Sequence, residues 1–234
     1  MILKQQTRFR SRLALKEKAE THQNTMPQPK DEAAAVQCFA ECARPPILRY
    51  LNRRSCIASC RITIEVLKRF GIEAHPVPVR FVVCAPVYKI AFISGFSVES
   101  QTELRRGAAR YVDLAAGPKA GGGNTTWNGH VAVVTANYFL DPSFDQSLDA
   151  LASNGLQLDP LPYIALAPLP QPINRDALHL EFSLETANSI SLTAQYDSIP
   201  DYSFLETPAW ELDHVEPVIE EIAATMEARF ERCT

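Results

Sequence analysis

The segment that most constrains the fold is an amphipathic helix predicted over residues 55–71. Ser55 is a favoured N-cap residue, and behind it apolar side chains recur every three or four positions. Gly71 follows the last of them, where a left-handed residue commonly ends a helix. Cys56 therefore lies in the first turn of a helix that buries one face. Backbone N–H groups and the helix dipole favour a thiolate there, so Cys56 is a candidate nucleophile.

The chain after this helix changes to the alternating pattern of β-strands. Residues 75–84 are rich in β-branched side chains, and their prolines place the start of the strand at a sheet edge or at its first residues. Residues 130–141 predict a tight hairpin that turns near Asn137, and residues 178–196 predict a second hairpin. The expected fold class is therefore α+β, with helices packed on an antiparallel sheet.

Further helices and irregular segments complete the prediction. They are helices over residues 31–43, 47–51 and 215–232, a helix or wrapped segment over residues 144–152, and an irregular edge strand over residues 160–172. Pro45 and Pro46 are expected to end the first helix. Residues 87–96 fit a strand or a loop, and residues 103–114 fit a short helix or a connector. The glycine-rich residues 117–124 predict a mobile loop, because they lack the Gly-Lys-Ser/Thr pattern of a phosphate-binding loop.

Length and composition bound the class of protein. The chain has 234 residues, of which 46% are hydrophobic and 21% charged, as in ordinary soluble globular proteins. Its net charge of −4 gives no case for a nucleic-acid partner. No apolar run approaches the roughly 18 residues of a membrane helix, and the start lacks the apolar core of a secretory signal. We therefore expect a cytoplasmic protein with no membrane or nucleic-acid partner, and the oligomeric state stays open.

The first 30 residues differ from the rest in charge. They carry seven Lys or Arg side chains and two acids. Such a segment is most simply a flexible, solvated tail, and a transit peptide is the alternative. Residues 31–234 are then expected to form a single α+β domain. Within it, the core covers about residues 45–146, and residues 147–234 form an extension with no assigned role.

The six cysteines allow a second type of chemistry. Four of them form two i,i+4 pairs separated by thirteen residues, a spacing that suits two disulfides or a metal. Without a secretory signal, reduced thiols are the default. A redox or metal module is therefore an alternative, and the leading expectation includes no metal and no cofactor. The pairs are Cys38/Cys42 and Cys56/Cys60, and the other two are Cys84 and Cys233.

The first predicted hairpin supplies a base and an orienting group for Cys56. His130 opens its first strand, and Asp141 closes its second. A turn near Asn137 brings these two side chains opposite or nearly opposite each other. The carboxylate can then accept one imidazole N–H and fix the ring, which leaves the other nitrogen to face a thiol. Nucleophile, base and orienting group are the three parts of a cysteine acyl-transfer site.

This pattern resembles the transglutaminase-like superfamily, the papain-like branch that also contains the arylamine N-acetyltransferases. The resemblance covers about residues 45–146: a cysteine opens a helix that ends Leu-Lys-Arg-Phe-Gly-Ile-Glu-Ala, and Gly-His-Val-Ala-Val-Val and Leu-Asp-Pro-Ser follow. It implies that Cys56 is the nucleophile, His130 its base and Asp141 the orienting group. The distance to the terminal glycine suits a family helix that begins at Cys56, and from Cys60 that distance is too short.

The rest of the expected cleft follows from the same chemistry. A tetrahedral intermediate needs hydrogen-bond donors for its oxyanion, and the backbone N–H of Cys56 is the first candidate. Asn52 and Trp127 are candidates for a second donor. Asn128 and Gln146 flank the hairpin and are candidates for lining the cleft.

The resemblance implies a cysteine-dependent acyl-transfer enzyme. Its thiolate would attack an amide or ester carbonyl, form a thioester, and pass the acyl group to water or to an amine. Water would make it a peptidase or amidase, which we slightly favour, and an amine would make it a transglutaminase-type transferase. The expected substrates are proteins, peptides, or small amides or esters. A catalytically inactive binding or scaffold module of the same fold is a further alternative.

Overall fold

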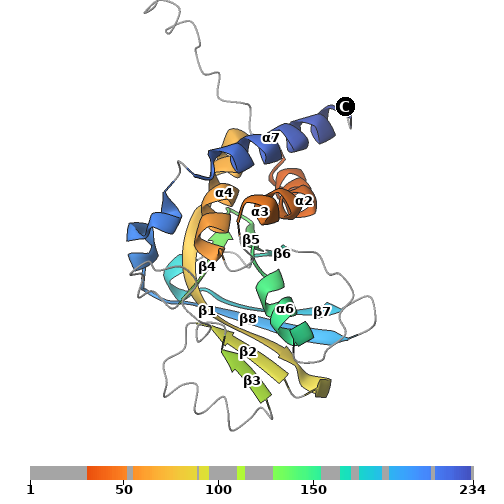
Figure 1. The fold of residues 1–234 in the computed structure, drawn as a ribbon, viewed down its shortest axis with the longest axis vertical. Coiled ribbons are helices and arrows are strands. Elements are labelled where there is room, and N and C mark those ends of the chain that lie inside the picture. The colour runs from red at the N-terminus through yellow and green to blue at the C-terminus, as the bar shows by residue number, and fades with distance from the viewer. Residues whose placement is uncertain are drawn as a thin grey trace, which may run out of the picture.

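The structure is a computed structural model of the chain. It describes residues 31–51, 55–88, 90–94, 110–113, 129–153, 164–169, 174–185, 190–211 and 214–232. Figure 1 shows most of the helices gathered at one end of the molecule and a large sheet at the other. Helices packed on a mainly antiparallel sheet confirm the α+β class. None of the helices that the structure describes has the length and apolar composition that crossing a bilayer requires.

Four helices form one layer. They are α2 (Glu32–Cys42), α3 (Arg44–Tyr50), α4 (Cys56–Arg69) and α7 (Glu216–Glu231). Helix α7 contacts the other three, as Figure 1 shows. Their apolar faces meet in one buried cluster that also contains Val131, Val133 and Leu140 of the sheet. The helices predicted over residues 31–43, 55–71 and 215–232 are therefore confirmed.

Helix α4 ends as the sequence predicts. Gly71 has a φ of 74°, and its N–H donates to the carbonyl of Lys68 at 3.0 Å. The N–H of Ile72 donates to the carbonyl of Leu67 at 3.1 Å, which completes a glycine-terminated helix end. Ser55 occupies the predicted N-cap position, although its side chain makes no capping hydrogen bond. The first residue of the helix is still the cysteine.

Two prolines lie inside a helix rather than between helices. Helix α3 begins at Arg44, so Pro45 and Pro46 occupy its first turn. The prediction that these prolines end the preceding helix, and that the next begins at residue 47, is therefore wrong. A proline lacks a backbone N–H, but the first N–H groups of a helix have no helical acceptor, so proline is tolerated there.

Eight strands form one sheet in the part of the chain that the structure describes. They are β1 (His75–Ala85), β2 (Ile90–Ser94), β3 (Arg110–Asp113), β4 (His130–Val134), β5 (Tyr138–Asp141), β6 (Ala165–Pro168), β7 (His179–Glu185) and β8 (Ser191–Ser198). Strand β1 pairs antiparallel with β2, β4 and β8, so the others assemble around it. Both predicted hairpins are confirmed, since β4 pairs with β5 and β7 with β8.

Several segments with open predictions have a definite structure. The structure gives strand β2 within residues 87–96, and it gives strand β3, parallel to β2, where a helix or connector was expected. Helix α6 (Asp145–Ser153) and edge strand β6 agree with their predictions. The prolines of β1 lie at its beginning. The loop predicted over residues 117–124 and the basic residues 1–30 lie outside the described residues. The described residues also contain four short 3-10 helices: η1 (Pro86–Tyr88), η2 (Arg175–Ala177), η3 (Ser203–Glu206) and η4 (Pro208–Trp210).

The β4–β5 hairpin separates two buried cores. Side chains alternate between the faces of a strand, so Val131 and Val133 face the helices. Ala132 and Val134 belong instead to a second cluster, which is built from the other face of the sheet and helix α6. The hairpin is therefore buried on both faces and has little freedom to move.

The first residue of α2 holds the turn of this hairpin. Oε1 of Glu32 accepts a hydrogen bond from the backbone N–H of Asn137 at 3.0 Å. Oε2 of Glu32 accepts a second one from the side-chain Nδ2 of Asn137 at 2.6 Å. The predicted turn near Asn137 is confirmed, and it is tied to the helical layer. His130 and Asp141 lie at the opposite, open end of the same hairpin.

Candidate active site

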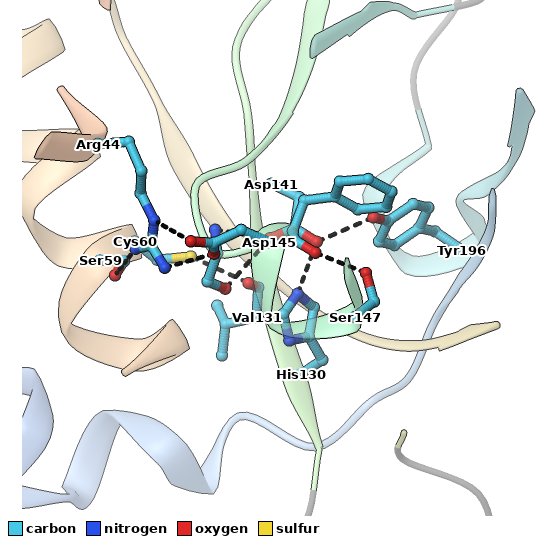
Figure 2. Close-up of polar contacts among 11 residues, drawn as sticks. Arg44, Ser59, Cys60, His130, Val131, Asp141, Asp145, Ser147 and Tyr196 are labelled. Carbon is cyan, nitrogen blue, oxygen red and sulfur yellow. Dashed lines mark hydrogen bonds and ion pairs between the residues drawn. The ribbon is translucent and has the colours of Figure 1, made fainter. Parts of the chain in front are cut away.

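His130 and Asp141 meet at the open end of the β4–β5 hairpin (Figure 2). The register pairs Val133 with Leu140. Asp141 therefore lies opposite Ala132 and diagonal to His130, with both side chains on one face. Nε2 of His130 is 2.8 Å from Oδ2 of Asp141. Both side chains are buried, with exposed fractions of 3% and 0%.

The carboxylate of Asp141 accepts four hydrogen bonds, two on each oxygen. Oδ1 accepts from the backbone N–H of Ser143 at 3.0 Å and from its hydroxyl at 3.2 Å. Oδ2 accepts from His130 and from the hydroxyl of Tyr196 at 2.9 Å. The bond to the Ser143 N–H is the Asx turn that an Asp-Pro-Ser sequence favours. Asp141 is therefore both a turn residue and the partner of the histidine.

The histidine and the aspartate carry opposite charges near neutral pH. Burial acts to lower the pKa of His130, but the charge and hydrogen bond of Asp141, together with the sulfur of Cys56 as an acceptor for the imidazolium, outweigh it and raise the pKa to about 10. Burial acts to raise the pKa of Asp141, but the charge of His130 and the surrounding donors hold it below its usual value. The site therefore contains an imidazolium–carboxylate pair.

Cys56 is the third member of this arrangement. It is the first residue of α4, its side chain is partly exposed, and it lies close enough to His130 to be among the causes that raise the pKa of that ring. Because Nε2 of His130 is hydrogen-bonded to Asp141, Nδ1 is the ring nitrogen that can contact the thiol. The structure thus brings together the three residues that the sequence predicts as nucleophile, base and orienting group.

Cys60, one helical turn further along α4, has a different environment. Its side chain is fully buried, and its thiol donates to the carbonyl of Val131 at 3.0 Å (Figure 2). Burial, together with the nearby Cys56 and Asp141, raises the pKa of the Cys60 thiol well above its usual value. A buried, protonated thiol is a poor nucleophile. Of the two cysteines on this helix face, Cys56 is therefore the one suited to react.

The remaining predicted site residues are only partly described. Gln146 is the second residue of α6, and within the described residues its Nε2 is buried with no hydrogen-bond partner. Unpaired buried donors are uncommon in proteins, so this Nε2 group is a donor that a ligand acceptor could satisfy. Asn52, Trp127 and Asn128 lie outside the described residues. For an oxyanion, the backbone N–H of Cys56 has the favourable position of a first-turn group with no helical acceptor.

A buried ion pair beside the site has no counterpart in the sequence prediction. Arg44 is 1% exposed, and its Nε donates to Oδ2 of Asp145 at 3.0 Å. Its Nη1 also donates to the hydroxyl of Ser59 at 3.5 Å (Figure 2). The pair joins α3 and α4 to the start of α6, four residues after Asp141. A charged side chain usually indicates an exposed position, so nothing in the sequence pattern pointed to this contact.

Tyr196 of β8 is the second contact that sequence reasoning missed. Its hydroxyl reaches Asp141 from a strand 55 residues further along the chain. One signal was available, because Tyr196 lies on the apolar face of an alternating strand. A tyrosine buried in that way needs a partner for its hydroxyl. The sequence does not show which residue this partner is.

The paired cysteines do not form the disulfides of the alternative prediction. No disulfide involves Cys38, Cys42, Cys56, Cys60 or Cys84, and Cys233 lies outside the described residues. The thiol of Cys42 is buried, and burial with the nearby Cys38 raises its pKa to about 12. Across the described ranges, no group of three or more His, Cys, Asp or Glu side chains converges as a metal site.

Comparison of the chain with protein-family models, with curated proteins and with solved structures gives no match.

Proposed function

We propose that this protein is a cysteine-dependent acyl-transfer enzyme with a transglutaminase-like, papain-like core. The observation that carries the proposal is the continuous chain of polar contacts from Cys56 through His130 to Asp141. In it a partly exposed thiol begins a helix, a buried imidazole lies next to that thiol, and a buried carboxylate bonds the imidazole. These are the three roles that nucleophilic catalysis by cysteine requires.

The charge state of the site supports the first chemical step. His130 bonded to Asp141 is held as an imidazolium, and a cation beside a thiol favours the thiolate. The ring of Phe81 lies 4.4 Å from the ring of His130, and an aromatic face adds a favourable contact for a cation. The Cys56 thiolate can then attack the carbonyl carbon of an amide or ester. A C–S bond forms, and the carbonyl oxygen becomes an oxyanion near the N-terminus of α4.

The second step needs the proton that His130 carries. As the tetrahedral intermediate collapses, Nδ1 of His130 gives its proton to the leaving amine or alcohol, and the bond from carbon to that group breaks. The product is a thioester on Cys56. The neutral imidazole then takes a proton from water or an amine as that nucleophile attacks the thioester. Breaking the C–S bond restores the thiolate and the imidazolium. Hydrolysis and transfer share every step except the identity of the acceptor.

The redox or metal alternative has less support. It uses Cys56 and Cys60 as a pair, but the Cys60 thiol is buried and donates to Val131. An inactive module of the same fold stays an alternative, and the reactivity of Cys56 separates the two.

The proposal predicts that Cys56 reacts faster than the other thiols and that His130 is the cause. At about pH 6.5, where ordinary thiols are almost entirely protonated, iodoacetamide should label Cys56 at least about tenfold faster than Cys84. Substitution His130→Ala should reduce the Cys56 rate by about tenfold or more, because the cation beside the thiol is lost. Labelling is measured for each cysteine by peptide mass spectrometry.

The exposed pair His179–Asp197 provides a matched control. Nδ1 of His179 lies 2.7 Å from Oδ1 of Asp197, so this pair is also a histidine bonded to an aspartate, but no cysteine is part of it. His179→Ala should leave the Cys56 rate unchanged within about twofold. Incubation with an activated ester, followed by intact-mass analysis, should show an acyl adduct on wild type and none on Cys56→Ala. Equal labelling of all cysteines, unaffected by His130→Ala, would refute the proposal.

A further inference from the structure

Tyr196 contributes to the site from outside the segment that resembles a known superfamily. It lies on β8, and its side chain is fully buried. Its hydroxyl donates to Oδ2 of Asp141 at 2.9 Å, the same oxygen that bonds His130 (Figure 2). Residues 147–234, which had no assigned role, therefore provide a direct partner for the carboxylate.

Three aromatic rings from three strands hold Tyr196 in place. Phe81 of β1 and Phe182 of β7 are stacked against its ring, at centroid distances of 5.6 Å and 5.9 Å. Phe139 of β5 contacts it at 4.6 Å with the ring planes tilted. The ring of Tyr196 is therefore fixed on several sides, and its hydroxyl is directed at the carboxylate. Phe81 also contacts His130, so the same group of rings borders both partners of Asp141.

We propose that Tyr196 is a positioning residue of this site, whose hydroxyl keeps the Asp141 carboxylate charged and aimed at His130. The inference rests on the proposed function for its consequence on Cys56, but the contact with Asp141 is tested separately below. The hydroxyl acts through Asp141, and it is not placed against the reacting thiol.

The arrangement of donors around Asp141 explains this role. Ser143 fixes Oδ1, and Tyr196 fixes Oδ2, so the carboxylate is held on both sides and cannot rotate away from His130. A fully buried carboxylate needs such donors to stay ionised, because burial disfavours the charge. The hydrogen bond from Tyr196 is among the causes that hold the pKa of Asp141 below its usual value.

Substitution Tyr196→Phe separates this role from packing, because it keeps the ring and removes only the hydroxyl. The readout is the downfield NMR resonance of the His130 Nε2–H, followed against pH in a Cys56→Ala background. That resonance changes when Asp141 becomes protonated. With Tyr196→Phe the change should occur about one pH unit higher than with Tyr196, because one donor to the carboxylate is missing.

Tyr138→Phe is the matched control. Tyr138 lies on β5, the strand that carries Asp141, and it is not one of the donors to that carboxylate. Its substitution should leave the resonance and its pH dependence unchanged. With Cys56 present, Tyr196→Phe should slow iodoacetamide labelling of Cys56 by about three- to tenfold, and Tyr138→Phe should not.

A second substitution protects the test against misfolding. Site-specific 3,5-difluorotyrosine at position 196 keeps the ring and makes the hydroxyl a stronger donor, so the resonance should persist to lower pH than in wild type. Unchanged pH dependence with both Phe and difluorotyrosine would overturn the proposal. Labelling that is insensitive to His130→Ala would overturn the proposed function instead, and the NMR result would still decide whether Tyr196 controls Asp141.

Discussion

At the scale of single residues, the charge of Asp141 is what distinguishes this site from an ordinary buried histidine. The carboxylate accepts four hydrogen bonds while fully buried, and one of them orients His130. A neutral acceptor of the same shape could hold the ring, but it could not stabilise an imidazolium. Orientation and charge are therefore separable by a substitution that keeps the shape.

The substitution Asp141→Asn separates the orienting role of this side chain from its charge. The amide retains an oxygen acceptor and most hydrogen-bonding geometry, but without its negative charge the pKa of His130 falls and the imidazolium is lost near neutral pH. We expect iodoacetamide labelling of Cys56 at about pH 6.5 to slow by about tenfold or more. Asp197→Asn, which alters the exposed pair with His179, is the control and should have no effect. A wild-type rate for Asp141→Asn would show that the carboxylate charge is not used.

At the scale of elements, the buried contact of Arg44 joins the parts of the fold that carry the site. Arg44 begins α3, Ser59 belongs to α4, and Asp145 begins α6. Cys56 lies on α4, and Asp141 lies just before α6, so this contact fixes the nucleophile-bearing helix relative to the carboxylate-bearing loop. Burial raises the pKa of Asp145 although the Arg44 bond and charge oppose it, so the pair is held in a poorly solvated place.

A double-mutant cycle tests that role. Arg44→Met leaves Asp145 buried without its cation, and we expect it to lower the free energy of unfolding by about 3–5 kcal/mol. Asp145→Leu should cost a similar amount, since it leaves the arginine unpaired. The double variant should lose much less free energy of unfolding than the sum of the two single losses, because neither charge stays buried alone. Urea unfolding near neutral pH measures all three.

An exposed arginine of the same helix serves as the comparison. Arg49 pairs with Glu221 of α7, and both side chains are at least a third exposed. Arg49→Met should change the free energy of unfolding by no more than about 1 kcal/mol, because exposed ion pairs contribute little. If Arg44→Met were equally mild, or if the double variant were simply additive, the buried pair would not have the structural role assigned to it.

At the scale of the whole molecule, local patterns predict the elements, and the pairing of distant strands around β1 decides which of them meet. Cys56, His130 and Asp141 were predictable, because a helix start and a short hairpin are set by nearby residues. Tyr196 was not predictable, because its contact depends on β1 pairing with both β4 and β8. Strand β3 was missed because its few residues show no clear alternation before they pair with β2.

Burial of His130 and Asp141 within this fold makes the stability of the molecule depend on pH. The pKa of His130 is raised from 6.5 to about 10, so its protonation stabilises the fold fully below about pH 6.5, and this contribution is lost as pH rises toward 10. The pKa of Asp141 is lowered, so its contribution is present above 3.8 and is lost only in stronger acid. The free energy of unfolding should therefore decline from pH 6.5 upward.

Other ionisable groups restrict the pH range in which this decline can be assigned to His130. The pKa of the buried Cys60 thiol is raised from 9.0, so its ionisation in the unfolded chain also weakens the fold at higher pH. The comparison therefore belongs between about pH 6.5 and 8.5, below the thiol range. Over that window, urea unfolding should show a clear decline for wild type and a flatter profile for His130→Gln, which cannot be protonated. Parallel profiles for the two proteins would mean that the imidazolium–carboxylate pair does not stabilise the fold.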